Sequence, residues 1–530
     1  MNILLEFTTI NYKMWHSLAK SLNELFPDSK FAGIVGYPPG RDNVLDYLKS
    51  QKSINYQFLY LNSDIYKNAY NEEIRYLELK EFEEGLPHKS LWRLIAADRG
   101  LGSAFMHGAV WQQNFINQNN NHENILRVFS GLLIQLRAIF VDFKPDLFLP
   151  AIAMGNIQVF IYEQLCKEFK IPYIVPSNVR VKNYFAFSAD SQLRFPQIDM
   201  TYRSIYEGRH STDMSSAQKI YEVLIGELKN PQYFDRINSR FNVAKYNSLL
   251  RKGKLAVRAA KAVINEIIYW GKNRKLRRSN DVRRQPDKLN VLLDNIANVA
   301  QFYYQKYWMT SPRFCSKLTS GEKYIYYPLH INPEYSTQIQ GTMWLDQVTL
   351  IELLAKSIPF DWKVYVKEHP GTLVARTRPL SFYKRLKKIP NVAIVPIDAD
   401  MHTLIINAQM VAVITGTSGW EAILRDKPLI TFADNVWDVL ELSRKCCNVE
   451  TLSKDIYDEF SRIKDICPNE RKKRIVSFLA AILEHSFEVS YPNQFVYTEP
   501  GTQEEYKILG QETAEALKKH LDYLKQESEK

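Results

Sequence analysis

The fold is decided by the stretch Met410-Val411-Ala412-Val413-Ile414-Thr415-Gly416-Thr417-Ser418-Gly419-Trp420-Glu421-Ala422. Its first five residues are a continuous apolar run, which is typical of a strand buried on both faces of a parallel sheet. We expect a helix from Trp420 to Arg425 and a second buried strand from Leu429 to Phe432. This order predicts a βαβ unit, in which the loop after the first strand lines a ligand crevice.

The loop of this βαβ unit contains residues that suit an anion. Thr417, Ser418 and Gly419 stand at the start of the expected helix, where unpaired N–H groups and the positive end of the helix dipole favour a phosphate. Serine and threonine are also ordinary helix N-caps, so a purely structural interpretation of the hydroxyls stays open. We expect the three residues to hold a nucleotide phosphate.

A second motif, Lys367-Glu368-His369-Pro370, precedes this unit. It ends the alternating run Trp362 to Val366, which predicts a strand whose carboxyl end points at His369. Pro370 prevents a simple continuation of the strand. A lone histidine beside a strand end is usually a structural hydrogen-bonding residue, but the two motifs in this order together predict a nucleotide-phosphate site.

These motifs resemble those of a known family. The matching runs are Tyr327 to Glu334, Lys367 to Pro370, Gly416 to Ala422 and Lys427 to Ile430. They are similar to the capsular polysaccharide biosynthesis glycosyltransferases, which include bacterial Kdo transferases and share His-Pro and Ser/Thr signatures with bacterial sialyltransferases. The resemblance implies an α/β, GT-B-like fold with two Rossmann-like domains that face each other across a cleft, and a nucleotide-sugar donor held mainly by the C-terminal domain.

The resemblance also implies roles for single residues. His369 would bind the donor phosphate and stabilise it as it leaves, Thr417 and Ser418 would add hydroxyl and backbone donors, and Glu421 would accept hydrogen bonds from ribose hydroxyls. A carboxylate near a helix N-terminus also has a simple electrostatic explanation, which stays open for Glu421. The other residues expected to bind the donor are His330, Lys367, Glu368 and Gly419.

The acceptor side is less defined. An inverting transferase needs a general base near the acceptor hydroxyl, and Glu6, Asp98 and the nearby His107 are candidates. We favour Asp98 as a catalytic residue, because an Asp-Arg pair before glycines indicates a positioned loop. A helix-ending salt bridge with Arg99 is the structural alternative. A retaining reaction would need no such base, and the stereochemistry stays open.

The length of 530 residues suits two domains of ~200 residues with insertions. We expect an N-terminal Rossmann-like acceptor domain at 1–200, a mostly helical basic insertion at 201–318, a C-terminal Rossmann-like donor domain at 319–490 and a helical tail at 491–530. The amphipathic residues from Glu504 onward predict a final helix that crosses back to the first domain. The expected N-terminal strands are Ile3 to Phe7, Phe31 to Tyr37, Tyr56 to Leu61, Leu147 to Pro150 and Tyr173 to Pro176.

The net charge is +11, from 69 lysines and arginines against 58 acidic residues. Most of the excess lies between Arg251 and Arg284, where apolar residues interleave with the cations at helical spacing. A basic amphipathic helix of this kind predicts binding to an anionic membrane surface, whereas a solvated helical face packed on its own domain is the alternative. The sequence contains no helix-turn-helix, zinc-finger or RNP signature, so we expect no nucleic-acid partner.

The expected location and cofactor requirements rest on the lack of sequence patterns for a signal peptide, a membrane span and a zinc site. The N-terminal segment lacks the basic and long apolar regions of a signal peptide, and no apolar run approaches the ~20 residues of a membrane span. Five cysteines without a zinc-type spacing fit reduced thiols, so we expect a cytoplasmic protein, peripheral at the inner face of the membrane. The Asp398-Ala399-Asp400 triplet has a metal-binding form, but its place after a C-terminal strand favours a metal-independent reaction, without a cofactor besides the nucleotide-sugar co-substrate.

We therefore expect a glycosyltransferase that moves a sugar, such as Kdo or sialic acid from a CMP donor, onto a surface polysaccharide or glycolipid. One alternative is an isomerase of the UDP-GlcNAc 2-epimerase type, which has the same two-domain fold. Another is a non-catalytic, membrane-associated adaptor of glycan assembly that uses the segment from Arg251 to Arg284.

Overall fold

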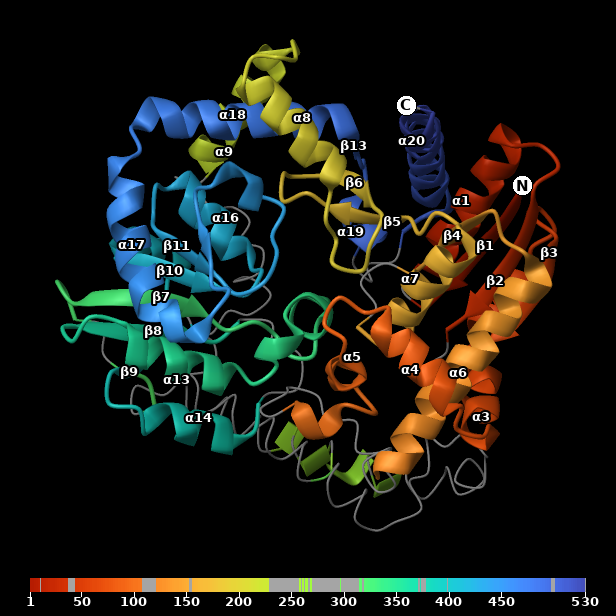
Figure 1. Ribbon diagram of the computed structural model, residues 1–530, viewed down its shortest axis with the longest axis horizontal. Coiled ribbons are helices and arrows are strands. Elements are labelled where there is room, and N and C mark those ends of the chain that lie inside the picture. The colour runs from red at the N-terminus through yellow and green to blue at the C-terminus, as the bar shows by residue number, and fades with distance from the viewer. Residues whose placement is uncertain are drawn as a thin grey trace.

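The computed structural model describes residues 1–9, 11–36, 43–106, 121–151, 155–227, 314–316, 319–369, 372, 378–397, 399–496 and 501–529, with single positions between 257 and 296. It contains two parallel sheets, each covered by helices, and the two lie side by side (Figure 1). This architecture confirms the predicted α/β class with two Rossmann-like domains.

The N-terminal sheet has four parallel strands in the order β3-β2-β1-β4. Its central strand β1 is the apolar run that the sequence predicts, and Ile3, Leu4 and Leu5 are fully buried in it. The strands are β1 (Asn2–Phe7), β2 (Lys30–Val35), β3 (Tyr56–Leu61) and β4 (Leu147–Leu149). The helices are α1 (Tyr12–Leu25), α2 (Asn43–Ser50), α3 (Asn62–Asn71), α4 (Tyr76–Glu84), α5 (Leu91–Ala97), α6 (His122–Phe143) and α7 (Gln158–Phe169).

The expected fifth N-terminal strand, Tyr173 to Pro176, is only partly correct. Tyr173 forms a single parallel bridge to Phe148 of β4. The chain then leaves this sheet, and β5 (Val175–Asn178) pairs antiparallel with β6 (Tyr184–Ser188), which in turn pairs with β13 (Ser486–Glu488). A third, small sheet therefore joins residues from both ends of the chain.

The C-terminal sheet has six parallel strands in the order β12-β11-β10-β7-β8-β9. Counted from β7, two strands follow on one side and three on the other, which is the order of dinucleotide-binding sheets. The strands are β7 (Lys323–Pro328), β8 (Trp362–Lys367), β9 (Val392–Val395), β10 (Met410–Val413), β11 (Leu429–Thr431) and β12 (Arg444–Lys445). The helices are α13 (Gln347–Ser357), α14 (Leu380–Lys387), α15 (Met401–Asn407), α16 (Thr417–Leu424), α17 (Leu452–Asp465) and α18 (Pro468–His485).

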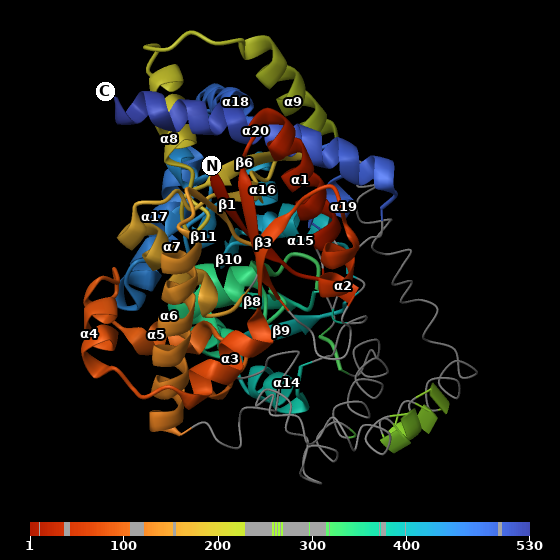
Figure 2. The same ribbon diagram turned by 90° about the vertical axis from the view of Figure 1, so that its right-hand side faces the viewer.

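Further helices connect the two halves. The long helix α18 packs on α8 (Pro196–Tyr206) and α9 (Met214–Glu227), across the top of Figure 1. After α19 (Pro492–Val496), the last helix α20 (Gln503–Ser528) crosses back and packs against α1, beside which it lies in Figure 2. This is the crossing that the amphipathic tail predicts.

The segment after β7 forms hydrogen bonds with the N-terminal half of the chain and so connects the two domains. It contains one π-helical turn, Ser336–Gln340, which packs against α5. The Gln338 side chain donates to the carbonyl of Ala97 at 2.7 Å, and the Tyr335 hydroxyl donates to the carbonyl of Ser191 at 2.6 Å. Both acceptors belong to the N-terminal half of the chain.

Among the described helices, only α6 is long and apolar enough to cross a membrane. Most of its apolar window is buried inside the protein, where the helix packs between α3 and α7. These contacts are those of a core helix.

Helix α20 approaches α1 closely at a glycine, and this contact generates a stability prediction. A Cβ at Gly510 would lie 2.7 Å from the carbonyl carbon of Ser17, which is too short for an unstrained contact. We expect Gly510→Val to push α20 away from α1 and destabilise the N-terminal domain by about 1–3 kcal/mol, the usual cost of overpacking. The measurement is the melting temperature, compared with Gly226→Ala, where a Cβ meets nothing within 4 Å. An equal melting temperature for the two variants would show that α20 does not dock as described.

Candidate functional site

The motif residues meet at one edge of the C-terminal sheet. His330 follows β7, His369 follows β8, and Thr415 to Ser418 follow β10. The strands β7 and β10 are neighbours from which the chain continues in opposite directions, so their carboxyl ends form the topological switch point where such sheets bind ligands. The structure thus brings together residues that are far apart in the sequence.

The loop after β10 has the form of an anion site. Helix α16 begins at Thr417, three residues earlier than expected, and its N-cap is Gly416 without any side-chain cap. The hydroxyls of Thr417 and Ser418 therefore do not cap the helix, against the structural interpretation: Thr417 is exposed, and Ser418 donates to the sulfur of Met401 at 3.4 Å. The N–H groups of Thr417 and Ser418 thus remain for a ligand, whereas the N–H of Gly419 donates to the carbonyl of Gly416 at 2.9 Å.

Gly419, expected among the donor-binding residues, has a packing role. It is buried, and a Cβ at this position would lie 2.9 Å from the Trp437 ring and 3.0 Å from Val413. The glycine allows α16 to lie close to β10, as the third glycine of dinucleotide-binding loops does. Gly419 therefore helps to position the loop by allowing this close packing.

His330 fixes the start of the same loop. Its Nε2 accepts the Thr415 N–H at 3.3 Å, and its own backbone N–H and carbonyl are held by the side chain of Gln347 at 2.9 and 2.8 Å. Burial, together with His369, Arg378 and Arg180, lowers the pKa of His330 to about 3, so the ring is neutral. A neutral ring that accepts at Nε2 carries its proton on Nδ1, and this buried Nδ1 has no hydrogen-bond partner among the described residues.

The Glu368 carboxylate organises the second strand end. It accepts from Arg378 Nε at 2.9 Å, from the Tyr383 hydroxyl at 2.7 Å and from the backbone N–H of His369 at 2.8 Å. Glu368 and Arg378 are 2% and 1% exposed. These contacts give Glu368 the role of positioning His369, and its oxygens are already engaged where the sequence predicts a donor ligand.

His369 itself is accessible. The surrounding protein desolvates the ring, although its surface still reaches solvent, and this desolvation lowers the pKa of His369 to about 4. A neutral imidazole in this position can donate one hydrogen bond to a phosphate oxygen. Lys367, the last residue of β8, is buried beside it. Pro370 of the same motif lies outside the described residues.

Glu421 lies one turn into α16 and is largely buried. Burial raises the pKa of Glu421 to about 7, an effect that Asp400 adds to and Arg425 opposes. A favourable helix dipole would lower this pKa, so the electrostatic explanation of the residue does not account for its state. Its Oε2 lies 3.6 Å from Nδ1 of His402 and has no hydrogen-bond partner among the described residues. The carboxylate is therefore suited to accept from hydroxyl groups.

The structure places Asp98 differently from the prediction. Its Oδ1 accepts the N–H groups of Gly100 and Leu101 at 2.8 and 2.9 Å, and its Oδ2 accepts the N–H of Ile157, the N-cap of α7, at 3.2 Å. Three backbone bonds to a buried carboxylate favour a role in holding the loop and α7 over a role as base. Arg99 does not form the helix-ending salt bridge with Asp98 that was the structural alternative, since it bonds to Gln338 at 3.0 Å.

Glu6 and Glu334 also have a raised pKa. Burial raises the pKa of Glu6 to about 7, and its carboxylate accepts from the Ala151 N–H at 2.9 Å and the Tyr162 hydroxyl at 3.4 Å. Glu334, at the junction of the domains, also has its pKa raised to about 7 by desolvation, against Arg99, Arg378 and Arg180. The Glu334 side chain is nevertheless exposed, and its carboxylate has no hydrogen-bond partner among the described residues.

Sequence reasoning assigned no role to Glu334, although the motif from Tyr327 to Glu334 contains it. The turn after β7 brings Glu334 to the junction of the domains, and no local sequence pattern predicts this turn. His107, the other candidate near the acceptor side, lies outside the described residues.

The Asp-x-Asp triplet is half described. Asp400 caps α15 by accepting the Thr403 N–H at 2.8 Å, whereas Asp398 lies outside the described residues. In the part of the chain that the structure describes, no three His, Cys, Asp or Glu side chains gather as a metal site would require.

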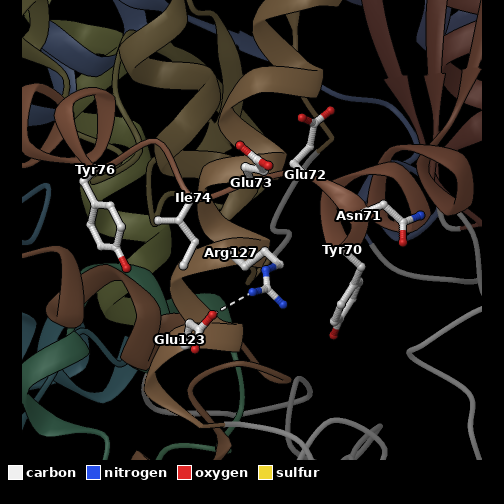
Figure 3. Close-up of a pocket in the computed structure, with 8 residues that line it drawn as sticks. All are labelled: Tyr70, Asn71, Glu72, Glu73, Ile74, Tyr76, Glu123 and Arg127. Carbon is white, nitrogen blue, oxygen red and sulfur yellow. Dashed lines mark hydrogen bonds and ion pairs between the residues drawn. The ribbon is translucent and has the colours of Figure 1, made fainter.

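A separate pocket of about 410 Å³ lies in the N-terminal domain, between the α3–α4 connection and the start of α6 (Figure 3). Its polar wall includes Glu72, Glu73 and Glu123, and Glu123 pairs with Arg127 at 2.7 Å. None of the predicted site residues lines it. The pocket is therefore distinct from the candidate site.

The raised pKa of Glu421 makes the stability of the protein depend on pH. The folded protein holds a proton on Glu421 between the ordinary pKa of 4.5 and about 7, so the wild type loses stability relative to a neutral variant as the pH rises through this window. We expect Glu421→Gln to gain melting temperature over the wild type between pH 4.5 and 7, with a constant difference above pH 7. Glu515→Gln, an exposed glutamate of α20, is the control. A pH-independent difference for Glu421→Gln would contradict the buried, protonated carboxyl.

The comparisons with known proteins agree with the motifs. Residues 295–450 match the family model of the capsule polysaccharide biosynthesis proteins, and this range includes the segment in which the sequence resembles that family. No curated protein matches the chain.

Several solved structures also match. They include UDP-GlcNAc 2-epimerase from Neisseria meningitidis bound to UDP-GlcNAc (11% identity, 91% of this chain and 100% of that chain, TM-score 0.23). The KpsC beta Kdo 2,4 transferase of Thermosulfurimonas dismutans matches with 12% identity, over 65% and 82% of the chains, with a TM-score of 0.28. Anabaena Alr3699/HepE in complex with UDP matches with 11% identity, over 93% and 98%, with a TM-score of 0.25. These scores are too low to support a conclusion about function.

The family match coincides with the described site, because His330, His369, Thr417, Ser418 and Glu421 all lie within it. Over residues 295–450 the chain is therefore similar to the capsule polysaccharide biosynthesis proteins.

Proposed function

We propose that the protein is a glycosyltransferase that moves a sugar from a nucleotide donor onto a surface polysaccharide or glycolipid. The observation that carries this proposal is the meeting of His330, His369 and the Thr415–Ser418 loop at the switch point of the C-terminal sheet. The family match over the same residues supports it.

In this proposal the donor phosphate lies at the N-terminus of α16. The backbone N–H groups of Thr417 and Ser418, the exposed hydroxyl of Thr417 and the ring of His369 would donate to its oxygens. Negative charge grows on the phosphate as the bond to the sugar breaks, so donors fixed in advance stabilise the transition state more than the ground state. We propose that these protein donors act without a metal ion or a further cofactor.

Glu421 would bind the ribose. Its Oε2 has no hydrogen-bond partner among the described residues and carries a pKa raised to about 7. Two ribose hydroxyls would supply the hydrogen bonds that this oxygen lacks, and they would favour the ionised carboxylate.

The finer assignment is a CMP-activated acidic sugar, such as Kdo or sialic acid, as the donor. It rests on the resemblance of the motifs to Kdo transferases and sialyltransferases. The base that would activate an acceptor stays a prediction: Asp98 is the original candidate, and the free carboxylate of Glu334 is the more accessible one.

The two other functional classes make different predictions. An isomerase of the UDP-GlcNAc 2-epimerase type would convert UDP-GlcNAc without any acceptor, and a non-catalytic adaptor would bind no nucleotide. A non-catalytic adaptor would not explain why the buried Nδ1 of His330 lacks a partner among the described residues or why the start of α16 has no side-chain cap.

The first test is thermal stabilisation by CMP, UMP, CDP, UDP and GDP. We expect stabilisation by CMP of about 2.7 kcal/mol at 100 times its dissociation constant, and we expect the effect to disappear in His369→Ala. The control is His210→Ala, a histidine that pairs with Glu484 at 3.0 Å, away from the site. Stabilisation by UDP alone would change the donor class, and no stabilisation by any nucleotide would overturn the proposal.

We further propose that the protein works on the cytoplasmic face of a membrane, attached through the segment from Arg251 to Arg284. Few of these residues are described. Val257, Ile264, Ile267 and Ile268 among them are each 46% exposed or more, beside exposed Arg258 and Lys261. Exposed apolar side chains interleaved with cations suit the surface of anionic lipids.

Vesicle sedimentation tests this attachment. We expect the protein to bind vesicles that contain phosphatidylglycerol and not vesicles of phosphatidylcholine alone. Arg258→Gln with Lys261→Gln should weaken binding by about 2 kcal/mol, since each cation near the lipid contributes about 1 kcal/mol. The matched control replaces Lys518 and Lys519, two exposed cations of α20, by glutamine. Equal binding to both kinds of vesicle would contradict the electrostatic attachment.

A further inference from the structure

Arg180 stands at the tip of the β5–β6 hairpin in a backbone conformation that few residues other than glycine adopt. Its φ is 64°, in the left-handed region that arginine rarely occupies. The backbone N–H of Arg180 donates to Oδ1 of Asn178 at 2.8 Å, and the amide of Asn178 donates to the carbonyl of Lys182 at 2.9 Å. The turn is therefore held in place by a side chain of its own strand.

The residues on both sides of Arg180 anchor the hairpin. Val179 and Val181 are 0% and 1% exposed, and they belong to a hydrophobic cluster that includes Tyr326 of β7 and Trp420 of α16. The hairpin follows the N-terminal sheet in the chain but packs on the C-terminal one. Arg180 is thus presented to the C-terminal domain from a rigid position, and residues held in strained backbone geometry are often functional.

The guanidinium reaches the loop that begins the anion site. Its Nη2 donates to the carbonyl of Thr415 at 3.2 Å, while the N–H of the same Thr415 is bonded to His330. Both backbone polar groups of Thr415, its N–H and its carbonyl, are therefore hydrogen-bonded. The Arg180 charge also lowers the pKa of His330 and opposes the raised pKa of Glu334, so it lies within electrostatic reach of both.

The other two arginines near Glu334 are engaged in building the structure. Arg378 is buried against Glu368 and the carbonyl of His330, and Arg99 bonds to Gln338 and to the carbonyl of Pro333. Arg180 differs in its position, because it touches the phosphate loop directly. A guanidinium has five N–H donors in a planar fork, so a bond to a carbonyl and a bond to a phosphate oxygen are compatible.

Two buried polar atoms at this place support a ligand. The Nδ1 of His330 and the Oγ1 of Thr415 have no hydrogen-bond partner among the described residues, and the two side chains are 8% and 1% exposed. Buried polar atoms in proteins are almost always hydrogen-bonded. Thr415 is the loop residue that Arg180 contacts, and His330 is bonded to the same residue.

We propose that Arg180 binds an oxygen of the nucleotide phosphate held by the Thr415–Ser418 loop, so that a hairpin outside the C-terminal sheet completes the donor site. This inference rests on the proposed function. It adds a residue that the C-terminal motifs do not include and makes donor binding depend on the hairpin between β5 and β6.

The test compares Arg180→Gln with the wild type, full-length and purified, by calorimetric titration with CMP and with UDP. We expect the nucleotide that binds the wild type to bind Arg180→Gln roughly 10- to 100-fold more weakly, the loss of one charge-assisted hydrogen bond. Arg180→Lys, which keeps the charge, should recover part of the affinity. The affinity of the wild type should also fall more steeply with added salt than that of Arg180→Gln.

The matched control is Lys182→Gln, a cation two positions away on the same hairpin whose Nζ pairs with Glu227 at 3.2 Å. It should bind nucleotide as the wild type does. Equal affinities for Arg180→Gln and the wild type would overturn the inference and leave the proposed function intact. A wild type that binds none of CMP, UMP, CDP, UDP and GDP would overturn both. A loss of affinity in Lys182→Gln equal to that in Arg180→Gln would show that the hairpin acts only through its fold.

Discussion

The candidate site depends on the buried ion pair between Glu368 and Arg378. Arg378 donates to the carbonyl of His330 after β7, and Glu368 accepts from the backbone of His369 after β8. One ion pair therefore ties together the two strand ends that carry the histidines. Removing one partner of such a buried pair generally costs about 3–5 kcal/mol, because the other charge is left without compensation. The geometry of both histidines follows from this pair, and through His330 the geometry of the Thr415–Ser418 loop as well.

The sequence predicts the two sheets well because their strands have strong local patterns. The runs at 3–7 and 410–414 are predicted as strands, and the structure has buried strands at both places. The Lys-Glu-His motif ends a strand, as predicted. The site residues found from the sequence are those that follow such strands, since the carboxyl ends of parallel strands meet at one edge. Local pattern therefore sufficed to place His330, His369 and Thr417 at this edge, and their roles in binding a donor stay predictions.

The remaining site residues depend on contacts that no local pattern encodes. Glu368 was expected to face the donor, but its oxygens are engaged by Arg378 and Tyr383, which follow it in the chain. Asp98 was expected to act as a base, whereas its carboxylate holds the N-terminus of α7. Arg180 and Glu334 come to the junction only through the packing of a hairpin and a turn. In each case at least one partner comes from another segment of the chain, although two of the three backbone bonds to Asp98 are local, from Gly100 and Leu101.

The contact between α20 and α1 has a consequence for biosynthesis. Helix α1 buries Met14, Trp15 and Leu18, and part of the cover over this layer is α20, which the ribosome adds hundreds of residues later. During translation the first domain therefore emerges with an incomplete apolar layer, which is closed only when α20 has been released. Transiently exposed apolar surface of this kind attracts chaperones or promotes aggregation. The N-terminal domain thus becomes fully folded only after the C-terminal sheet has been made, although its own strands come first in the chain.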